Sequence, residues 1–329
     1  MQQMFHKYSL KFGIPRRYMQ QSTAITPVSP FLLGQSTGRE TGAAFTGFFT
    51  EAGEGLELTQ HQISFRINKS KETQADSEIT IYNISDNTRK FLESQAGNLP
   101  QVELYLGYET TDMFLAFQGD VVKAIDEFDG VTRRTKLLLK TGTVEIKEAV
   151  SSRSYRGGVA TSRVYEDLVF DLGLPLGNYQ PSSIAMAPLK KPIVVQGNTF
   201  QILKKVTKEM GHNLYIEDNV VNLVSREWKN PSAIVATKIS ADTNMIGSPA
   251  AESEGEDLTS TQNGNRMALT VKTTMSHYKL DDVVEIDSKY HKGVYQISSI
   301  EYVGDFEGTD WLVNLKVKPV DGYEIRGAK

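Results

Sequence analysis

Few residues of this chain have the type and spacing that a chemical site needs. The histidines occur singly and none lies four residues from another, at positions His6, His61, His212, His277 and His291. Zinc sites on helices usually need paired histidines at such a spacing. The chain also contains no cysteine, which excludes thiolate catalysis and cysteine-ligated zinc or iron–sulfur sites. The sequence therefore predicts no metal, no cofactor and no catalytic residue of these kinds.

Pairs of carboxylates are the remaining candidates for catalysis. Neighbouring acids occur at Asp126 with Glu127, at Glu166 with Asp167 and at Asp281 with Asp282. A glycosidase needs only two carboxylates at a suitable separation. However, 40 acidic residues are spread along the chain, so such pairs also arise by chance. The sequence contains no nucleophile elbow, P-loop or dinucleotide-binding glycine motif. We therefore expect no enzymatic activity and keep a carboxylate-based glycan (peptidoglycan) hydrolase as an alternative.

Length and composition describe an ordinary globular chain. Its 329 residues fit two or three domains, and its hydrophobic fraction of 39% is near the globular average. The net charge of −4 and the absence of a domain-sized basic region argue against specific nucleic-acid binding. Polar residues His6, Lys7 and Tyr8 stand where a signal peptide needs an apolar core, and nowhere do about eighteen apolar residues run together. We expect neither secretion by the usual signal route nor a membrane-spanning segment.

One strand pattern occurs twice, around residues 79–132 and 269–309. Both copies contain four segments in the same order, and the first of them matches Ile79-Thr80-Ile81 to Leu269-Thr270-Val271. The other matched segments are 99–104 with 280–286, 119–122 with 293–295, and 128–132 with 306–309. Spacings between segments differ, so the loops must vary in length. Internal duplication and the common composition of β-strands both explain this pattern. Duplication predicts two similar antiparallel β-barrels.

Between the two copies the apolar period changes from two to about 3.6. Val164, Leu168 and Leu172 share one face of a helix that starts near Thr161 or Ser162 and ends at Gly173. A second helix follows an N-cap at Asn198 and ends at Gly211, and a hairpin that turns at Asp218-Asn219 comes next. Within the first copy, a charged turn spans residues 69–76 and Ser85 caps a further helix. The elements between the copies predict a small α/β domain.

The predicted fold class is β-rich α+β, with two similar tube-type antiparallel β-barrels separated by a small α/β domain. An N-terminal strand and extended arm occupy residues 1–60, and the first barrel occupies 61–150 with a helix insertion at 85–96. The α/β domain spans 151–228 and the second barrel 229–329.

The segment from residue 20 to residue 55 has a different composition. It is rich in Ser, Thr, Gly and Pro and carries isolated apolar groups without helical or strand period. Such a segment cannot build its own core. It is either an arm that orders against a partner or a long loop. Because buried aromatic groups dominate interface energies, the candidate interface residues are Phe31, Phe45, Phe48 and Phe49.

Three stretches and one tryptophan carry a resemblance to a known family. They are SEITIYNIS at residues 77–85, LDDVVEI at 280–286, GVYQISSIEYVGD at 293–305, and Trp311 in the last expected strand. With the order of the domains, they resemble the baseplate hub proteins of contractile-tailed bacteriophages. That family is related to late control protein D and to the hub part of type VI secretion spikes. The resemblance covers most of the chain from about residue 60 onward.

The resemblance implies a structural protein of the virion. Two tube-type barrels per chain would assemble as a homotrimer around a channel, with six near-equivalent barrels in one ring. This baseplate hub would join the hexameric tail tube protein to the trimeric central spike protein and contact neighbouring baseplate proteins. DNA would pass through the channel without specific binding during ejection. Assembly would take place in the bacterial host cytoplasm. A receptor- or carbohydrate-binding tail module is the alternative.

Overall fold

The computed structural model describes residues 5–13, 56–71, 76–89, 100–130, 132–180, 188–225, 236–251 and 267–320. Most of these residues lie in antiparallel β-strands, so the chain has a β-rich α+β fold. The four candidate interface phenylalanines, Phe31, Phe45, Phe48 and Phe49, lie outside the described residues. In the described ranges, no helix is long and apolar enough to cross a membrane.

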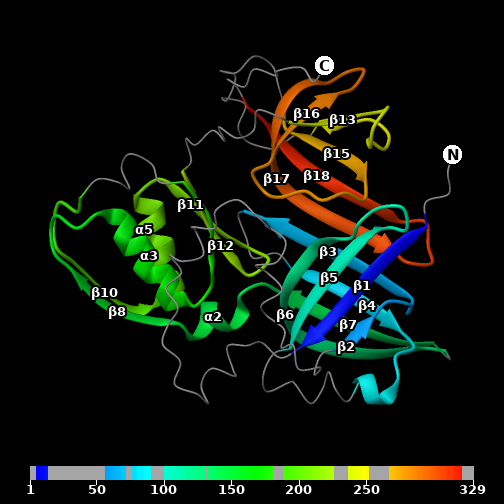
Figure 1. The fold of residues 1–329 in the computed structure, drawn as a ribbon, viewed down its shortest axis with the longest axis horizontal. Helices are drawn as coiled ribbons and strands as arrows, with labels where there is room; N and C mark the ends of the chain where they lie inside the picture. Colours follow the sequence, from blue (N-terminus) through cyan, green and yellow to red (C-terminus); the bar gives the residue numbers. More distant parts are fainter. Residues whose placement is uncertain are drawn as a thin grey trace.

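One sheet of thirteen strands forms the larger part of the molecule (Figure 1). Its N-terminal strands are β1 (His6–Gly13), β2 (Leu56–Leu58), β3 (Ile63–Ser70), β4 (Ser77–Tyr82), β5 (Gln101–Tyr108), β6 (Phe114–Asp129) and β7 (Thr132–Lys140). Its C-terminal strands are β13 (Thr237–Ser240), β14 (Ala250–Ala251), β15 (Leu269–Thr274), β16 (Val283–Asp287), β17 (Lys292–Asp305) and β18 (Trp311–Pro319). The strand order is β14-β15-β18-β17-β3-β4-β7-β6-β5-β1-β2, with β16 beside both β17 and β13.

Four strands of each half pair in the same way. The order is β4-β7-β6-β5 in the first half and β15-β18-β17-β16 in the second, and every pair is antiparallel. The long strand of each set carries a β-bulge at the same place, directly after Val121 on β6 and directly after Ile297 on β17. The backbone N–H of Val121 donates to Pro100, and that of Ile297 donates to Asp282. Pro100 directly precedes β5 and Asp282 directly precedes β16. The likeness of the two strand sets therefore extends to individual hydrogen bonds.

The structural register of this repeat differs from the match suggested by the sequence. Ile79 lies opposite Leu137, and Val271 lies opposite Leu315, which is the equivalent of Leu137. The structural counterpart of Ile79 is therefore Val271, whereas the sequence match pairs Ile79 with Leu269. The two-residue difference preserves the inward face, because side chains alternate along a strand. The repeated order of strands is therefore present, and closure of each set into a barrel stays a prediction.

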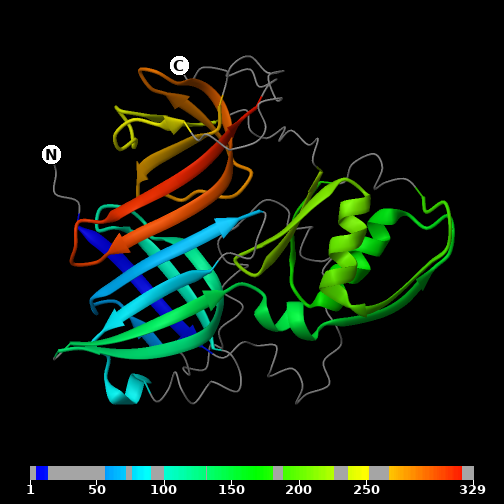
Figure 2. The ribbon, with the colours of Figure 1, turned by 180° about the vertical axis from the view of Figure 1, so that it is seen from behind.

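A smaller α/β part follows the first strand set. Its elements are α2 (Thr143–Glu148), β8 (Val150–Tyr155), α3 (Thr161–Leu172), β9 (Leu176–Gln180), β10 (Ile193–Asn198), α5 (Thr199–Glu209), β11 (His212–Glu217) and β12 (Val220–Ser225). Figures 1 and 2 show α3 and α5 between the β8–β10 ribbon and the β11–β12–β9 sheet. The expected caps are confirmed: Asn198 accepts the N–H of Gln201, and Gly173 ends α3 at φ 81°. The division of the chain into domains stays a prediction.

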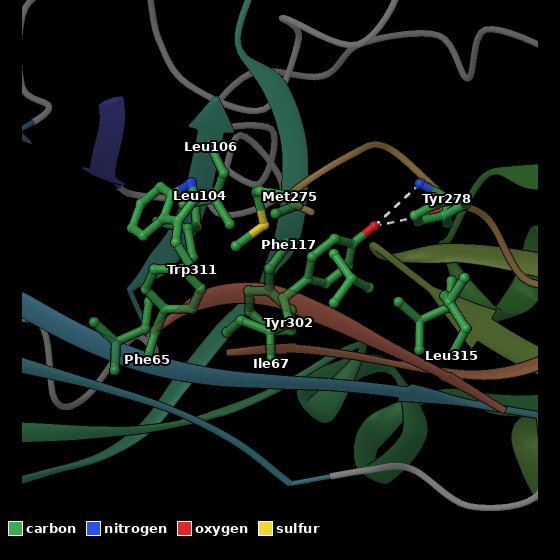
Figure 3. Packing of buried hydrophobic residues seen from close by; sticks show 14 of the residues in the cluster. Phe65, Ile67, Leu104, Leu106, Phe117, Met275, Tyr278, Tyr302, Trp311 and Leu315 are labelled. Atoms are coloured by element: carbon green, nitrogen blue, oxygen red, sulfur yellow. Dashed lines mark hydrogen bonds between the residues drawn. The ribbon is translucent and has the colours of Figure 1, made fainter. Parts of the chain in front are cut away.

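The two strand sets share one hydrophobic core, while α3 and α5 build a second core with their own sheets. Tyr302 on β17 is fully buried at the centre of the first core (Figure 3). Its hydroxyl donates to the carbonyl of Tyr278 and accepts that residue's N–H, at 3.1 and 3.2 Å. This pairing satisfies the polar end of a large apolar side chain, so the ring can be buried without an orphaned hydroxyl.

The pair β3–β17 joins the two strand sets. At one end of this pair Gly304 lies opposite Phe65, and the Phe65 ring packs edge-to-face on Trp311 with ring centroids 5.4 Å apart. A Cβ atom on Gly304 would lie 2.3 Å from Cζ of Phe65 and 2.9 Å from Cε3 of Trp311. The rings of Phe65 and Trp311, which lie close together in Figure 3, therefore occupy the space that any other residue at position 304 would need.

We expect Gly304→Ala to lower the free energy of unfolding by about 1–3 kcal/mol, because both rings must shift from a packed position. Urea denaturation of the full chain measures this change. The matched control is Thr309→Ala, an exposed position in the same hairpin, which should change stability by about 0.5 kcal/mol or less. Equal effects of the two substitutions would contradict the packing argument.

Candidate functional site

Charged side chains gather where the β11–β12 turn reaches the β3–β17 pair. Lys69, near the end of β3, is only 7% exposed. Its Nζ lies 2.5 Å from Oδ2 of Asp218 and 3.6 Å from Oε1 of Glu217. Lys71 forms a second ion pair with Asp281, which directly precedes Asp282. We call this set, together with Tyr215, the ionic junction, since it links the α/β part to both strand sets.

The β11–β12 turn has the geometry needed to reach this position. Asp218 and Asn219 both adopt positive φ, at 50° and 60°. Two-residue hairpin turns of type I′ need this conformation at both central residues, and Asp and Asn tolerate it better than most side chains. Oδ1 of Asp218 accepts the N–H of Gln118 on β6 at 3.1 Å, and Oδ1 of Asn219 accepts the N–H of Gly142 before α2 at 2.8 Å. One of these side-chain hydrogen bonds therefore fixes the turn to the first strand set, and the other fixes it to the segment that joins β7 to α2.

Asp281 anchors the other side of the ionic junction. It is 6% exposed and has φ 71°, a conformation that costs an L-residue free energy. One carboxylate oxygen accepts the Tyr215 hydroxyl at 2.7 Å, while the other pairs with Lys71. Tyr215 lies on β11, Lys71 directly follows β3, and Asp281 precedes β16. Three separate parts of the chain therefore meet at one carboxylate.

Burial shifts the protonation equilibria of the ionic junction. It raises the pKa of Glu217 to about 7, a rise that the charge of Lys69 opposes. It also raises the pKa of Asp282 and, together with the neighbouring Asp281, that of Tyr215. Burial works against the Lys69 ammonium, but the charges of Asp218 and Glu217 raise its pKa above the usual value. At neutral pH Lys69 is therefore a cation, while the raised pKa of Glu217 lies close to the ambient pH.

The carboxylates of the acid pair Asp281–Asp282 contact groups of the fold. Asp281 is held by Tyr215 and Lys71, and Oδ2 of Asp282 accepts the N–H of Lys279 at 3.0 Å. Within the described part of the chain, no group of three or more His, Cys, Asp or Glu side chains could hold a metal.

The other acid pairs are also engaged in ion pairs or lie at the surface. Asp126 binds Arg133 at 2.6 Å and Thr135 at 2.7 Å, and these contacts lower its pKa although burial opposes them. Its neighbour Glu127 is exposed on β6. On α3, Arg163 lies near both Glu166 and Asp167. Asp126 and Glu127 are consecutive on β6 and point to opposite faces of the sheet, whereas Glu166 and Asp167 share Arg163 as a partner.

Sequence patterns located only part of the ionic junction. The sequence indicates the Asp218-Asn219 hairpin and the acid pair at 281–282 as motifs. It does not indicate that Lys69 pairs with Asp218 or that Lys71 pairs with Asp281. Lys69 was expected in a charged turn, and it instead lies in β3 with its ammonium buried. Alternation along β3 places Lys69 on the same face as Ile67, which is the one signal that could have indicated its burial.

Lys69→Met should lower the free energy of unfolding by about 3–5 kcal/mol, because Asp218 and Glu217 would remain buried without a cation. Lys136→Met is the matched control, since Lys136 pairs with Glu78 at a half-exposed site and should contribute about 1 kcal/mol or less. Urea denaturation at neutral pH compares the two variants. A Lys69→Met protein as stable as the control would contradict a structural role for the buried charge.

The raised pKa of Glu217 predicts a pH dependence of stability. Its folded-state pKa of about 7 exceeds the usual 4.5, so the folded state binds more protons between these values. Stability from this group is fully present below pH 4.5 and is lost as the pH rises through 7. We expect the free energy of unfolding to fall by roughly 1–3 kcal/mol between about pH 5 and pH 8 from this group.

The difference between wild type and Glu217→Gln isolates this contribution. His277 has a pKa lowered by burial and acts in the opposite direction, but it is present in both proteins. Glu307→Gln, in an exposed turn, should leave the wild-type profile unchanged. If the Glu217→Gln and wild-type profiles run parallel from about pH 5 to pH 8, Glu217 does not titrate in this range.

Comparison with known proteins gives fold likenesses without sequence likeness. The prophage MuSo2 43 kDa tail protein from Shewanella oneidensis matches with a TM-score of 0.53 at 9% identity, over 79% of this chain and 98% of that chain. A tail protein from Neisseria meningitidis MC58 gives 0.54 at 8% identity, over 80% and 93%. The half-lidded Francisella PdpA–VgrG complex gives 0.56 at 9% identity, over 98% and 59%.

No protein-family model and no curated protein matches the sequence. At 8–9% identity, the structural likenesses show a shared fold alone. The chain therefore has the β-rich fold found in phage tail proteins and in a VgrG-containing complex.

Proposed function

We propose that this chain is a structural component of a bacteriophage tail and serves as the baseplate hub. Three copies form a homotrimer whose six strand sets stand in one pseudo-sixfold ring. The ring joins the hexameric tail tube to the trimeric central spike. The observation that carries this proposal is the repeat of the four-strand order, including its bulge, in both halves of the chain.

The repeat supports a change of symmetry. A trimer of chains with one strand set presents three equivalent surfaces, whereas a trimer of chains with two presents six. One face of such a ring matches a hexameric partner, and the three α/β parts keep the threefold symmetry of the other partner. The fold shared with tail proteins supports placing this arrangement in a tail.

The ionic junction supports a structural rather than catalytic role. It fixes the α/β part on both strand sets through Lys69, Asp218 and Asp281, so the three parts keep one relative position. Such rigidity suits a component that must align two partners on one axis. Duplex DNA carries about one negative charge per 1.7 Å of axis, so a channel lined by a chain of net charge −4 favours passage without specific binding.

The oligomeric state tests the proposal. We expect mass photometry of the full chain, alone or co-expressed with the spike and tube proteins of the same tail, to show three times 36.6 kDa, about 110 kDa. Electron microscopy of the intact tail should place this density on the axis. A monomer that persists with those partners present would contradict the proposal, and so would density only at the periphery of the tail.

A further inference from the structure

The repeat leaves one half-strand without the partner that its counterpart has. On β17, the segment Ser299–Asp305 pairs with β18 on one side and with β3 on the other. On β6, the equivalent segment after the bulge, Lys123–Asp129, pairs with β7 on one side. On its other side no strand of the described residues pairs with it. We call this segment the open edge.

Exposure distinguishes the open edge from its counterpart. Ile300, Tyr302 and Gly304 on β17 are buried. Their counterparts on β6, counted from the bulge, are Ala124, Asp126 and Phe128, and all three are exposed. Phe128 is 72% exposed although it is a large aromatic residue. Figure 2 shows the end of the β6–β7 hairpin projecting beyond the rest of the sheet, at the lower left.

Among the described residues, the backbone of the open edge has no partner strand for its outward hydrogen-bonding groups. The N–H of Asp305 donates to Asp310 on the β18 side, and the N–H of Phe306 donates to Ile63 on the β3 side. Since these directions alternate along a strand, Gly304, Tyr302 and Ile300 face β3. Their counterparts Phe128, Asp126 and Ala124 then direct their N–H and C=O groups outward. An unpaired edge of this kind is a template for another strand.

The chain also contains the counterpart of β3 in its second half. Arg66 on β3 faces Glu78 on β4, and Ala250 on β14 faces Thr270 on β15. Glu78 and Thr270 occupy equivalent places opposite Leu138 and Lys316. β14 is therefore the equivalent of β3, and it stands at the end of the sheet with no described strand on its far side.

We propose that the open edge on β6 of one copy pairs with β14 of a second copy of this chain. The interchain contact then repeats the β3–β17 contact that one chain already makes within itself. Val303 lies opposite Arg66 in that contact, so Glu127 lies opposite Ala250 of the second copy. This inference rests on the trimer of the proposed function and specifies which surfaces meet in it.

The residue sizes at the proposed contact are complementary. Within the chain, the large ring of Phe65 lies opposite Gly304. In the proposed contact between copies, Pro249 takes the place of Phe65 and Phe128 takes the place of Gly304. The aromatic ring therefore comes from the β6 side of the contact, whereas within one chain it comes from β3. Pro249 has no N–H, and this end of the interchain ladder therefore contains one hydrogen bond fewer. In this contact, the second copy would bury Phe128, which is exposed in a single chain.

Engineered disulfides test the contact, because the chain has no cysteine of its own. Glu127→Cys and Ala250→Cys together should give a covalent trimer on a denaturing gel after mild oxidation, reversed by reductant. A directly opposed pair of this kind brings the two Cα atoms to about 4.5 Å, within disulfide range. The matched control combines Glu127→Cys with Ser152→Cys, an exposed position on β8, and should give no cross-link.

Two further measurements make the outcome specific. Mixing the two single-cysteine proteins should give a covalent dimer, since each cysteine then comes from a different copy. Ala124→Pro removes an outward N–H and should raise the concentration of half-assembly by about tenfold or more, while Ala124→Ser keeps the N–H and assembles like wild type. Circular dichroism verifies that both variants fold.

The results separate this inference from the function on which it rests. A wild-type trimer without the 127–250 cross-link would overturn the contact and leave the hub proposal standing. A wild type that stays monomeric with its tail partners present would overturn both. A cross-linked mixture with the 127–152 control reacting equally would show random collision and would also overturn the contact.

Discussion

The antiparallel pair β3–β17 is the contact on which the remaining structure depends. It is formed by residues more than 200 positions apart in sequence, and it merges two strand sets into one sheet with one core. It also carries Lys69 opposite Ile300, at the end of the pair that the β11–β12 turn reaches. The α/β part can be fixed on both strand sets because the β3–β17 pair brings the ionic-junction residues of both sets close together.

The α/β part is fixed by buried ion pairs rather than by apolar contacts alone, and this affects the geometry of the contact. Apolar groups of similar volume often stabilise a core as well as a buried ion pair does. A buried charge, however, tolerates few arrangements, because any displacement leaves it unpaired. Asp281 illustrates this requirement, since its strained backbone places the carboxylate between Tyr215 and Lys71. A buried ion pair can therefore restrict the geometry of a contact even where it adds little net stability relative to apolar groups.

Local signals predicted the elements of this fold better than the contacts between them. Asn198, Gly173 and the Asp218-Asn219 turn have side chains or backbone preferences that act within a few residues, and each was found where expected. The register of the repeat depends on strand pairing across the whole sheet, and alternation alone permits a shift of two residues. The burial of Lys69 depends on a turn about 150 residues away, which no local pattern contains.

The differences between the two strand sets bear on how the proposed ring closes. Head-to-tail contacts between identical modules form either closed rings or open filaments, depending on the rotation at each contact. In this chain the contact between its two strand sets is the β3–β17 pair, which forms when the chain folds. Gly304 lies beneath the ring of Phe65 in that contact. In the proposed ring, the other contact has Phe128 at the equivalent place and would form between copies. A ring of six modules would then need only three contacts between chains, because the other three are already made within the chains.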